Sequence, residues 1–288
     1  MEFVPKERAL PIRMPSTANL MIDSEDRASG LPNDFTITKL NSILNGFFTR
    51  ISTTELVLEW LTPNINGTEG IKNNIIGVSL NGGAVTNYQA PPSFYTQAQL
   101  LDWLAEQLSI ITAPTTWSIV LSTPSVTASG GVALLVPSAP VDIVLSGPIA
   151  DLLNLELAGP QPVNNNANPY FSVAGDLRLY RYIDFVSSQL TNNQSLKDAS
   201  TAPIVRDVLA RWYFAYDNPP ALDAYGFPIL MGYTPFVLRR TFSPPKEIRW
   251  ETNIPVGQLS FQVYQPNGEL AEFDTGSGWL MTLQVSEV

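Results

Sequence analysis

The stretch EIRWETNIPVGQLSFQVYQPNGELAEFDTGSGWLMTLQVSEV, residues 247–288, gives the strongest indication of the fold in this chain. Over residues 259–264 apolar residues alternate with polar or mixed ones, which predicts a strand with one apolar face. Residues 265–268, Gln-Pro-Asn-Gly, fit a type I turn followed by a glycine in the left-handed conformation. We therefore expect residues 269–273 to run back along the first strand.

A further strand is predicted at the end of the chain. Every second residue from Trp279 to Val285 is apolar, and the residues between are mostly polar. The stretch thus predicts an antiparallel meander, which is typical of a β-sandwich. We expect Trp250, Phe261, Trp279 and Leu283 to belong to its core.

The composition excludes several kinds of chemistry. The 288 residues contain no cysteine and no histidine, which rules out thiol redox chemistry, cysteine zinc sites and the Ser-His-Asp triad. An enzyme of this composition would depend on carboxylates, Lys, Tyr or Ser, and no phosphate-binding loop or dinucleotide fingerprint occurs. We predict no catalytic residue, no cofactor and no metal.

The charge balance limits the partners. Lys and Arg number 16 against 26 Asp and Glu, a formal net charge of −10, which opposes direct binding of nucleic acid. No apolar run reaches the ~18 to 20 residues that span a bilayer, so we expect no membrane span. Only 15% of residues are charged, and a surface poor in charge is often one that contacts other proteins.

The domain organisation follows from changes of pattern along the chain. Proline-rich residues 1–30 predict an extended N-terminal arm without a core of its own, either a disordered tail or a strap along a neighbouring subunit. We predict a jelly roll in two parts, 31–83 and 174–288. Between them residues 84–173 predict a separable α/β unit, in which a capping box at Thr96-Gln97-Ala98-Gln99 starts a helix.

The number of strands indicates the same architecture. We expect strands of the sandwich near residues 35, 55, 76, 183, 210, 240, 261 and 282. Eight strands are the complement of a single jelly roll, and the α/β unit falls between the third and the fourth of them. The predicted fold class is mainly β, a single jelly-roll sandwich with an inserted small α/β unit.

Three groups of residues are candidate sites. Paired carboxylates could hydrolyse glycosides, but the candidates occupy strand positions that usually face solvent: Glu55, Glu59, Glu251 and Glu272. Tryptophans could stack on sugars, although core packing is the commoner role: Trp60, Trp103, Trp117, Trp212, Trp250 and Trp279. A basic cluster flanks one strand pair and suits edge protection or an interface: Arg239, Arg240, Lys246 and Arg249.

An acidic group also precedes the sandwich. Asp23, Glu25 and Asp26 gather carboxylates, but the glycine and terminal glutamate of a calcium loop do not follow at the required spacing. We therefore predict no metal there.

Several ordered segments resemble a known family, the penton (vertex) proteins of virophages, polinton-like viruses and related eukaryotic double jelly-roll DNA viruses. The segments are LPNDFTITKL, GFFTRISTTELVLEWLTPNI, NNIIGVSL followed by YTQAQLLDWL, PVDIVLSGPIADLLNLELAG, RYIDFVSSQLTNNQSLKD, IRWETNIPVGQLSFQVYQPNGEL and WLMTLQVSE. They cover nearly the whole chain beyond residue 30. The resemblance implies a single jelly roll with an inserted domain.

The resemblance also implies a function. Five copies of such a protein fill the icosahedral vertex beside double jelly-roll major capsid proteins. The expected partners are thus a homopentamer, the major capsid protein and other minor capsid proteins, at the capsid vertex of a virion assembled inside the host cell. The alternatives are a carbohydrate- or receptor-binding jelly roll and a histidine-free glycosidase; we expect no enzyme.

Overall fold

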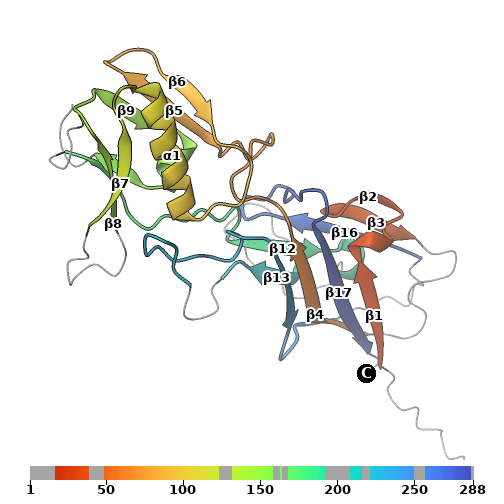
Figure 1. Cartoon of the computed structure of the whole chain (residues 1–288). Coiled ribbons are helices and arrows are strands. Elements are labelled where there is room, and N and C mark those ends of the chain that lie inside the picture. The colour runs from red at the N-terminus through yellow and green to blue at the C-terminus, as the bar shows by residue number, and fades with distance from the viewer. Residues whose placement is uncertain are drawn as a thin grey trace, which may run out of the picture.

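The computed structural model describes residues 17–38, 49–122, 132–157, 163, 168–191, 208–215, 221–249 and 257–286. The chain forms two lobes (Figure 1). One is a sandwich of two antiparallel sheets, and the other, the inserted lobe, holds the long helix and two smaller sheets.

Each sheet of the sandwich draws strands from distant parts of the sequence. The first sheet has the order β1 (Thr17–Asp23), β17 (Gly278–Ser286), β4 (Arg50–Trp60) and β14 (Phe236–Thr241), with β15 (Glu247–Arg249) also paired to β4. The second has the order β13 (Val208–Tyr213), β12 (Tyr182–Val186), β16 (Gln258–Tyr264), β3 (Asp34–Thr38) and β2 (Ser29–Leu31). Two short helices, η1 (Ser24–Asp26) and α3 (Ser188–Thr191), adjoin these strands.

The order of the strands is that of a jelly roll. Along the chain β1, β3 and β4 alternate between the two sheets, β12 and β13 form a pair in the second, and β14, β16 and β17 alternate again. Inward-facing residues of both sheets fill the space between them, as in sandwiches generally. The predicted fold class, a mainly β single jelly roll, is confirmed.

The predicted terminal meander is wrong, because β16 and β17 lie in opposite sheets. Both strands turn their apolar faces into the same core, where the rings of Phe261 and Trp279 lie 5.7 Å apart. The predicted turn is present, with Gly268 at a φ of 102°, but the strand expected at 269–273 is reduced to one bridge between Tyr264 and Leu270. Alternation shows which side of a strand is buried, and it does not show which sheet the strand joins.

The predicted core residues are buried where the structure describes them. Phe261, Trp279 and Leu283 all lie in the sandwich core. Trp250 lies outside the described residues.

Seven of the eight predicted strands belong to the sandwich, and within the described residues the two sheets reach ten strands with β1 and the short strands β2 and β15. The strand expected near residue 76 is β5 (Ile75–Leu80), which belongs to the inserted lobe. Its place in the sandwich is taken by β1, which the sequence assigned to the arm. Because β1 pairs with β17 along its whole length and buries Ile22, the arm can extend only over residues 1–16, which lie outside the described residues.

The inserted lobe contains two small antiparallel sheets. One has the order β6 (Thr86–Gln89), β5 and β9 (Ile143–Ser146), and the other has β10 (Leu155–Leu157), β11 (Tyr170–Ser172), β8 (Val132–Pro137) and β7 (Trp117–Ser122). The helices are α1 (Gln97–Ile111) and α2 (Pro148–Leu152). The predicted capping box at the start of α1 is present, since Gln99 N donates to Thr96 Oγ1 and Thr96 N donates to Gln99 Oε1.

The core of the inserted lobe reaches beyond residues 84–173. It includes Ile65 and Ile76 before that range, and Phe227 and Tyr233 after it. The boundary expected at Gly82-Gly83 falls between β5 and β6, which pair with one another. The limits of the inserted unit therefore need revision, and we place its start soon after β4 ends.

Candidate interaction surfaces

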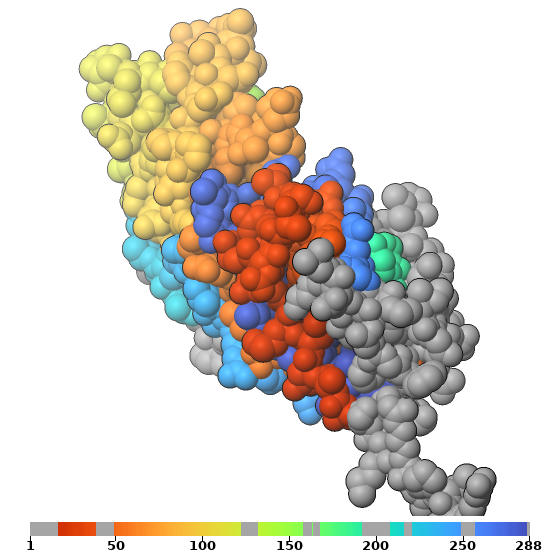
Figure 2. Space-filling view, turned by 90° about the vertical axis from the view of Figure 1, so that its right-hand side faces the viewer, coloured from red at the N-terminus to blue at the C-terminus, as the bar shows by residue number. Residues whose placement is uncertain are grey.

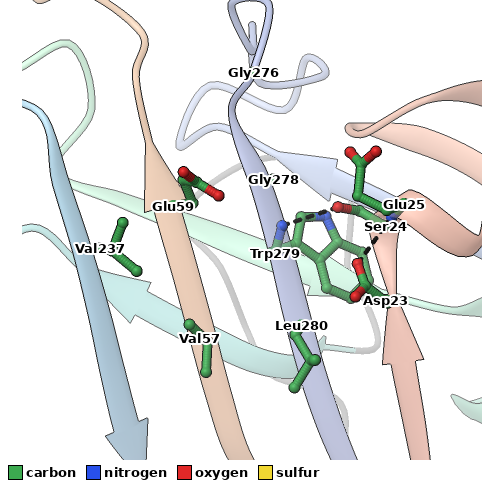
Figure 3. A pocket seen from close by; sticks show the side chains of 10 residues that line it. All are labelled: Asp23, Ser24, Glu25, Val57, Glu59, Val237, Gly276, Gly278, Trp279 and Leu280. Carbon is green, nitrogen blue, oxygen red and sulfur yellow. Dashed lines mark hydrogen bonds between the residues drawn. The ribbon is translucent and has the colours of Figure 1, made fainter.

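An open hollow of about 340 Å³ lies on the outer face of the first sheet (Figure 3). Its apolar walls come from three strands, through Val57 of β4, Val237 of β14 and Leu280 of β17. The remaining lining residues are Asp23, Ser24, Glu25, Glu59, Gly276, Gly278 and Trp279. The hollow is thus lined both by apolar side chains of the sheet and by carboxylates.

Two local contacts shape the acidic side of this hollow. Trp279 N donates to Ser24 Oγ at 2.9 Å, and Glu25 N donates to Asp23 Oδ1 at 2.9 Å. Gly278 permits the close approach of η1, because a Cβ at this position would lie 3.2 Å from Ser24 Oγ. The turn that carries Asp23 and Glu25 is therefore held against the start of β17.

Glu55 and Glu59, two of the carboxylates considered for glycoside hydrolysis, lie too far apart to act as a pair. Glu55 and Glu59 share the outer face of β4, four residues apart, which corresponds to about 13 Å along a strand. That exceeds the ~5 to 9.5 Å separation of glycosidase carboxylates. Glu55 is bound by Arg239 at 2.5 Å, Glu272 lies beyond β16, and Glu251 lies outside the described residues.

The tryptophans mostly pack in the two cores. The buried members are Trp60, Trp117, Trp212 and Trp279. Trp103 of α1 is partly buried against the core of the inserted lobe. Core packing, the commoner role, is confirmed for these five residues, so sugar stacking has no support from the described tryptophans; Trp250 lies outside the described residues.

The basic cluster lies along one edge of the sandwich. Arg239 is two-thirds exposed, and the guanidinium of Arg240 lies 4.7 Å from the ring centroid of Trp212. Lys246 Nζ donates to Val208 O at 3.3 Å, which ties the segment before β15 to β13. The side chain of Arg249 lies outside the described part.

A second charged group on the outer face of the second sheet was not predicted. Arg211 donates to both oxygens of Asp184, at 2.6 and 2.9 Å, and its guanidinium lies 4.2 Å from the ring centroid of Tyr182. The Asp184 side chain is only 3% exposed. Hydrogen bonding to this carboxylate raises the pKa of Arg211 above its usual range, so the guanidinium stays protonated.

The sequence could not show this pair, because it depends on register. Asp184 and Arg211 face each other across β12 and β13, and Tyr182 is paired with Tyr213 two residues further along the two strands. Once the two strands are known to pair, alternation places all four side chains on one face. Tyrosine and arginine held rigidly in this way are typical of protein interfaces.

Hydrogen bonds fix the segments through which the chain passes between the two lobes. Asn64, after β4, donates to Tyr95 O at 2.9 Å and to Leu177 O at 3.2 Å. The segment before β14 contributes Asp223, which accepts from Ala98 N at 2.8 Å at the start of α1. Tyr225 of the same segment donates to Asp102, and desolvation raises the pKa of this tyrosine to about 12.

Among the described residues, no cluster of acidic residues is arranged to hold a metal ion, Asp23, Glu25 and Asp26 included. No helix in the same ranges has the length and apolar character needed to cross a membrane.

Comparison with solved structures relates the whole chain to one fold. The crystal structure of selenomethionine-labelled mavirus penton protein matches with a TM-score of 0.50 and 12% sequence identity, covering 96% of this chain and 100% of that one. The chain has a penton-like fold. No family model and no curated protein sequence matches.

This similarity includes the inserted lobe as well as the sandwich, since it extends over nearly the full length of both chains. At 12% identity the similarity concerns the fold alone.

Proposed function

We propose that this chain is a penton subunit, a structural protein that forms pentamers at the icosahedral vertices of a virus capsid. The observation that carries the proposal is the penton-like fold over 96% of the chain. The absence of cysteine and histidine agrees with it, because the chain lacks the commonest catalytic side chains. The proposed partners are four further copies, a double jelly-roll major capsid protein and other minor capsid proteins.

A vertex subunit has to meet neighbours on two different flanks. Five-fold closure uses heterologous interfaces, in which one flank of a subunit contacts a different flank of the next. A sandwich with two open sheets suits this task, because each flank exposes one edge strand of each sheet. Residues 1–16 precede β1 at one of these edges and are the proposed strap toward a neighbouring subunit.

The test is the oligomeric state of the purified protein and its position in a particle. Native mass spectrometry should give a five-subunit species, and a reconstruction of the particle should place the protein at the five-fold axes. A protein that is located on the faces of the capsid, or outside the particle, would contradict the proposal. The carbohydrate-binding alternative stays a prediction, for which a glycan array is the direct measurement.

A further inference from the structure

The exposed apolar residues of the sandwich follow a simple rule. Among the described residues, each large apolar side chain that is exposed on a sandwich strand belongs to one of the four edge strands. These are Met21 of β1 at 65% exposure, Leu31 of β2 at 66%, Tyr213 of β13 at 47% and Val237 of β14 at 60%. Edge strands usually carry charge and little exposed apolar surface, so these edges are suited to contact another protein.

The four edges form two flanks. The strands β1 and β2, joined by η1, lie on one side, and β13 and β14 lie at the opposite ends of the same two sheets. Residues 17–38 cover the first flank, shown in red in Figure 2. We call it the acidic flank, and we call residues 208–213 with 236–249 the basic flank.

The two flanks carry opposite charge. The acidic flank has four carboxylates, Asp23, Glu25, Asp26 and Asp34, against Arg27, a net formal charge of −3. In the basic flank, residues 236–249 hold four basic residues against Glu247, a net formal charge of +3. Arg211 of β13 is paired with Asp184 of β12 and is therefore not counted. The chain as a whole has a net charge of −10, so a basic flank is unusual in it, and this one lies opposite the acidic flank.

We propose that the acidic flank of one copy binds the basic flank of the next copy, with Met21 and Leu31 packing near Val237 and Tyr213. This inference rests on the proposed function and names the surfaces by which the ring closes. A heterologous contact of this kind repeats from copy to copy, since each subunit keeps one flank of each sign free for the next. Opposite potentials align the flanks, and the apolar residues supply the buried area.

The experiment is a charge swap within the full chain. One variant, Asp26→Lys with Asp34→Lys, makes the acidic flank basic. Another, Arg239→Glu with Lys246→Glu, makes the basic flank acidic. Either variant alone gives the two contacting flanks charges of the same sign, and we expect loss of the ring species in native mass spectrometry. The combined variant restores opposite charges, and we expect the ring to return.

A matched control separates the flanks from net charge. Glu106→Lys with Glu156→Lys makes the net charge more positive by the same amount as the acidic-flank variant, on exposed positions of the inserted lobe, and it should leave the ring intact. Circular dichroism establishes that each variant is folded. If a reversal does not fold, the neutral versions Asp26→Asn with Asp34→Asn and Arg239→Gln with Lys246→Gln should weaken the ring.

Salt provides an independent measurement. Raising the ionic strength from about 0.1 M to about 1 M shortens the screening length from about 10 Å to about 3 Å, so the ring fraction of the wild-type chain should fall. The inference would be overturned if a single-flank reversal keeps the ring, or if the combined variant folds but does not regain it. Either result would leave the vertex proposal standing. A wild-type chain that stays monomeric at the highest soluble concentration would also overturn it. A swap-sensitive ring with a number of subunits other than five would support these flanks and contradict the vertex role.

Discussion

Replacing Trp279 by alanine tests the sandwich core most directly. The side chain is 3% exposed and lies between both sheets. Its ring centroid is 5.3 Å from that of Phe35, 5.0 Å from Phe185 and 5.7 Å from Phe261, and Nε1 donates to Pro32 O at 2.8 Å. Truncation would leave three rings facing a cavity and one carbonyl without its donor.

The expected loss of stability is at the upper end of the range for a buried aromatic residue, about 5 kcal/mol. Since domains of this size lose about 2 to 4 °C per kcal/mol, the melting midpoint should fall by about 10 to 20 °C. Circular dichroism during heating measures it. The control is Trp103→Ala, a partly buried tryptophan of α1, which should cost about 2 kcal/mol or less. An unchanged midpoint for Trp279→Ala would refute the packing described for this core.

Three further predictions concern the arm, the buried ion pair and the inserted lobe. Deleting residues 1–16 should leave the melting curve unchanged and weaken co-sedimentation with capsid proteins. Deleting residues 1–29 also removes β1, so the melting midpoint should fall by more than 5 °C, on the same scale of about 2 to 4 °C per kcal/mol. Arg211→Ala should lower the free energy of unfolding in urea by about 3 to 5 kcal/mol, because it leaves the buried Asp184 with an unpaired charge. Asp184→Ala should lower it less, because Arg211 can reach water. Excision of residues 84–173 should yield a protein that binds ANS, because β5 and the segment before β14 would lose the core that covers them.

Each of these has an outcome that counts against it. If the protein that lacks residues 1–16 still co-sediments with capsid proteins at the same salt concentrations as the wild type, residues 1–16 are only a tail. Equal costs for the two alanine variants would mean that the buried carboxylate finds another partner. A soluble excised protein that does not bind ANS would restore the boundary predicted from the sequence.

The sequence predicted strands well and their neighbours poorly. In β16 and β17 the alternation of apolar and polar residues matches the burial of each strand. Both patterns are equally compatible with one sheet or two, because inward-facing residues of either sheet enter the same core. The choice of sheet depends on contacts with β3 and β4, which are far away in the sequence.

The errors at β1 and β5 have a related cause. In β1 the alternation Ala18, Leu20, Ile22 is present but weak, and the prolines and charges around it favoured an arm. In β5 the residues from Ile76 to Ser79 are all buried, which is consistent with a strand in any core. Local pattern identifies burial, whereas the partner that buries a strand is a property of the whole fold.

The inserted lobe shows the same dependence on distant contacts, and it bears on assembly. The segment between β13 and β14 leaves the sandwich, buries Phe227 and Tyr233 in the inserted lobe, and returns to begin β14 at Phe236. Tyr233 accepts a hydrogen bond from Leu177 N at 2.7 Å, which links this segment to the passage between the lobes. Because β14 is one of the two edge strands of the basic flank, the position of that flank depends on the packing of the inserted lobe as well as on the sandwich. The insertion is therefore part of the structure that presents the proposed interface.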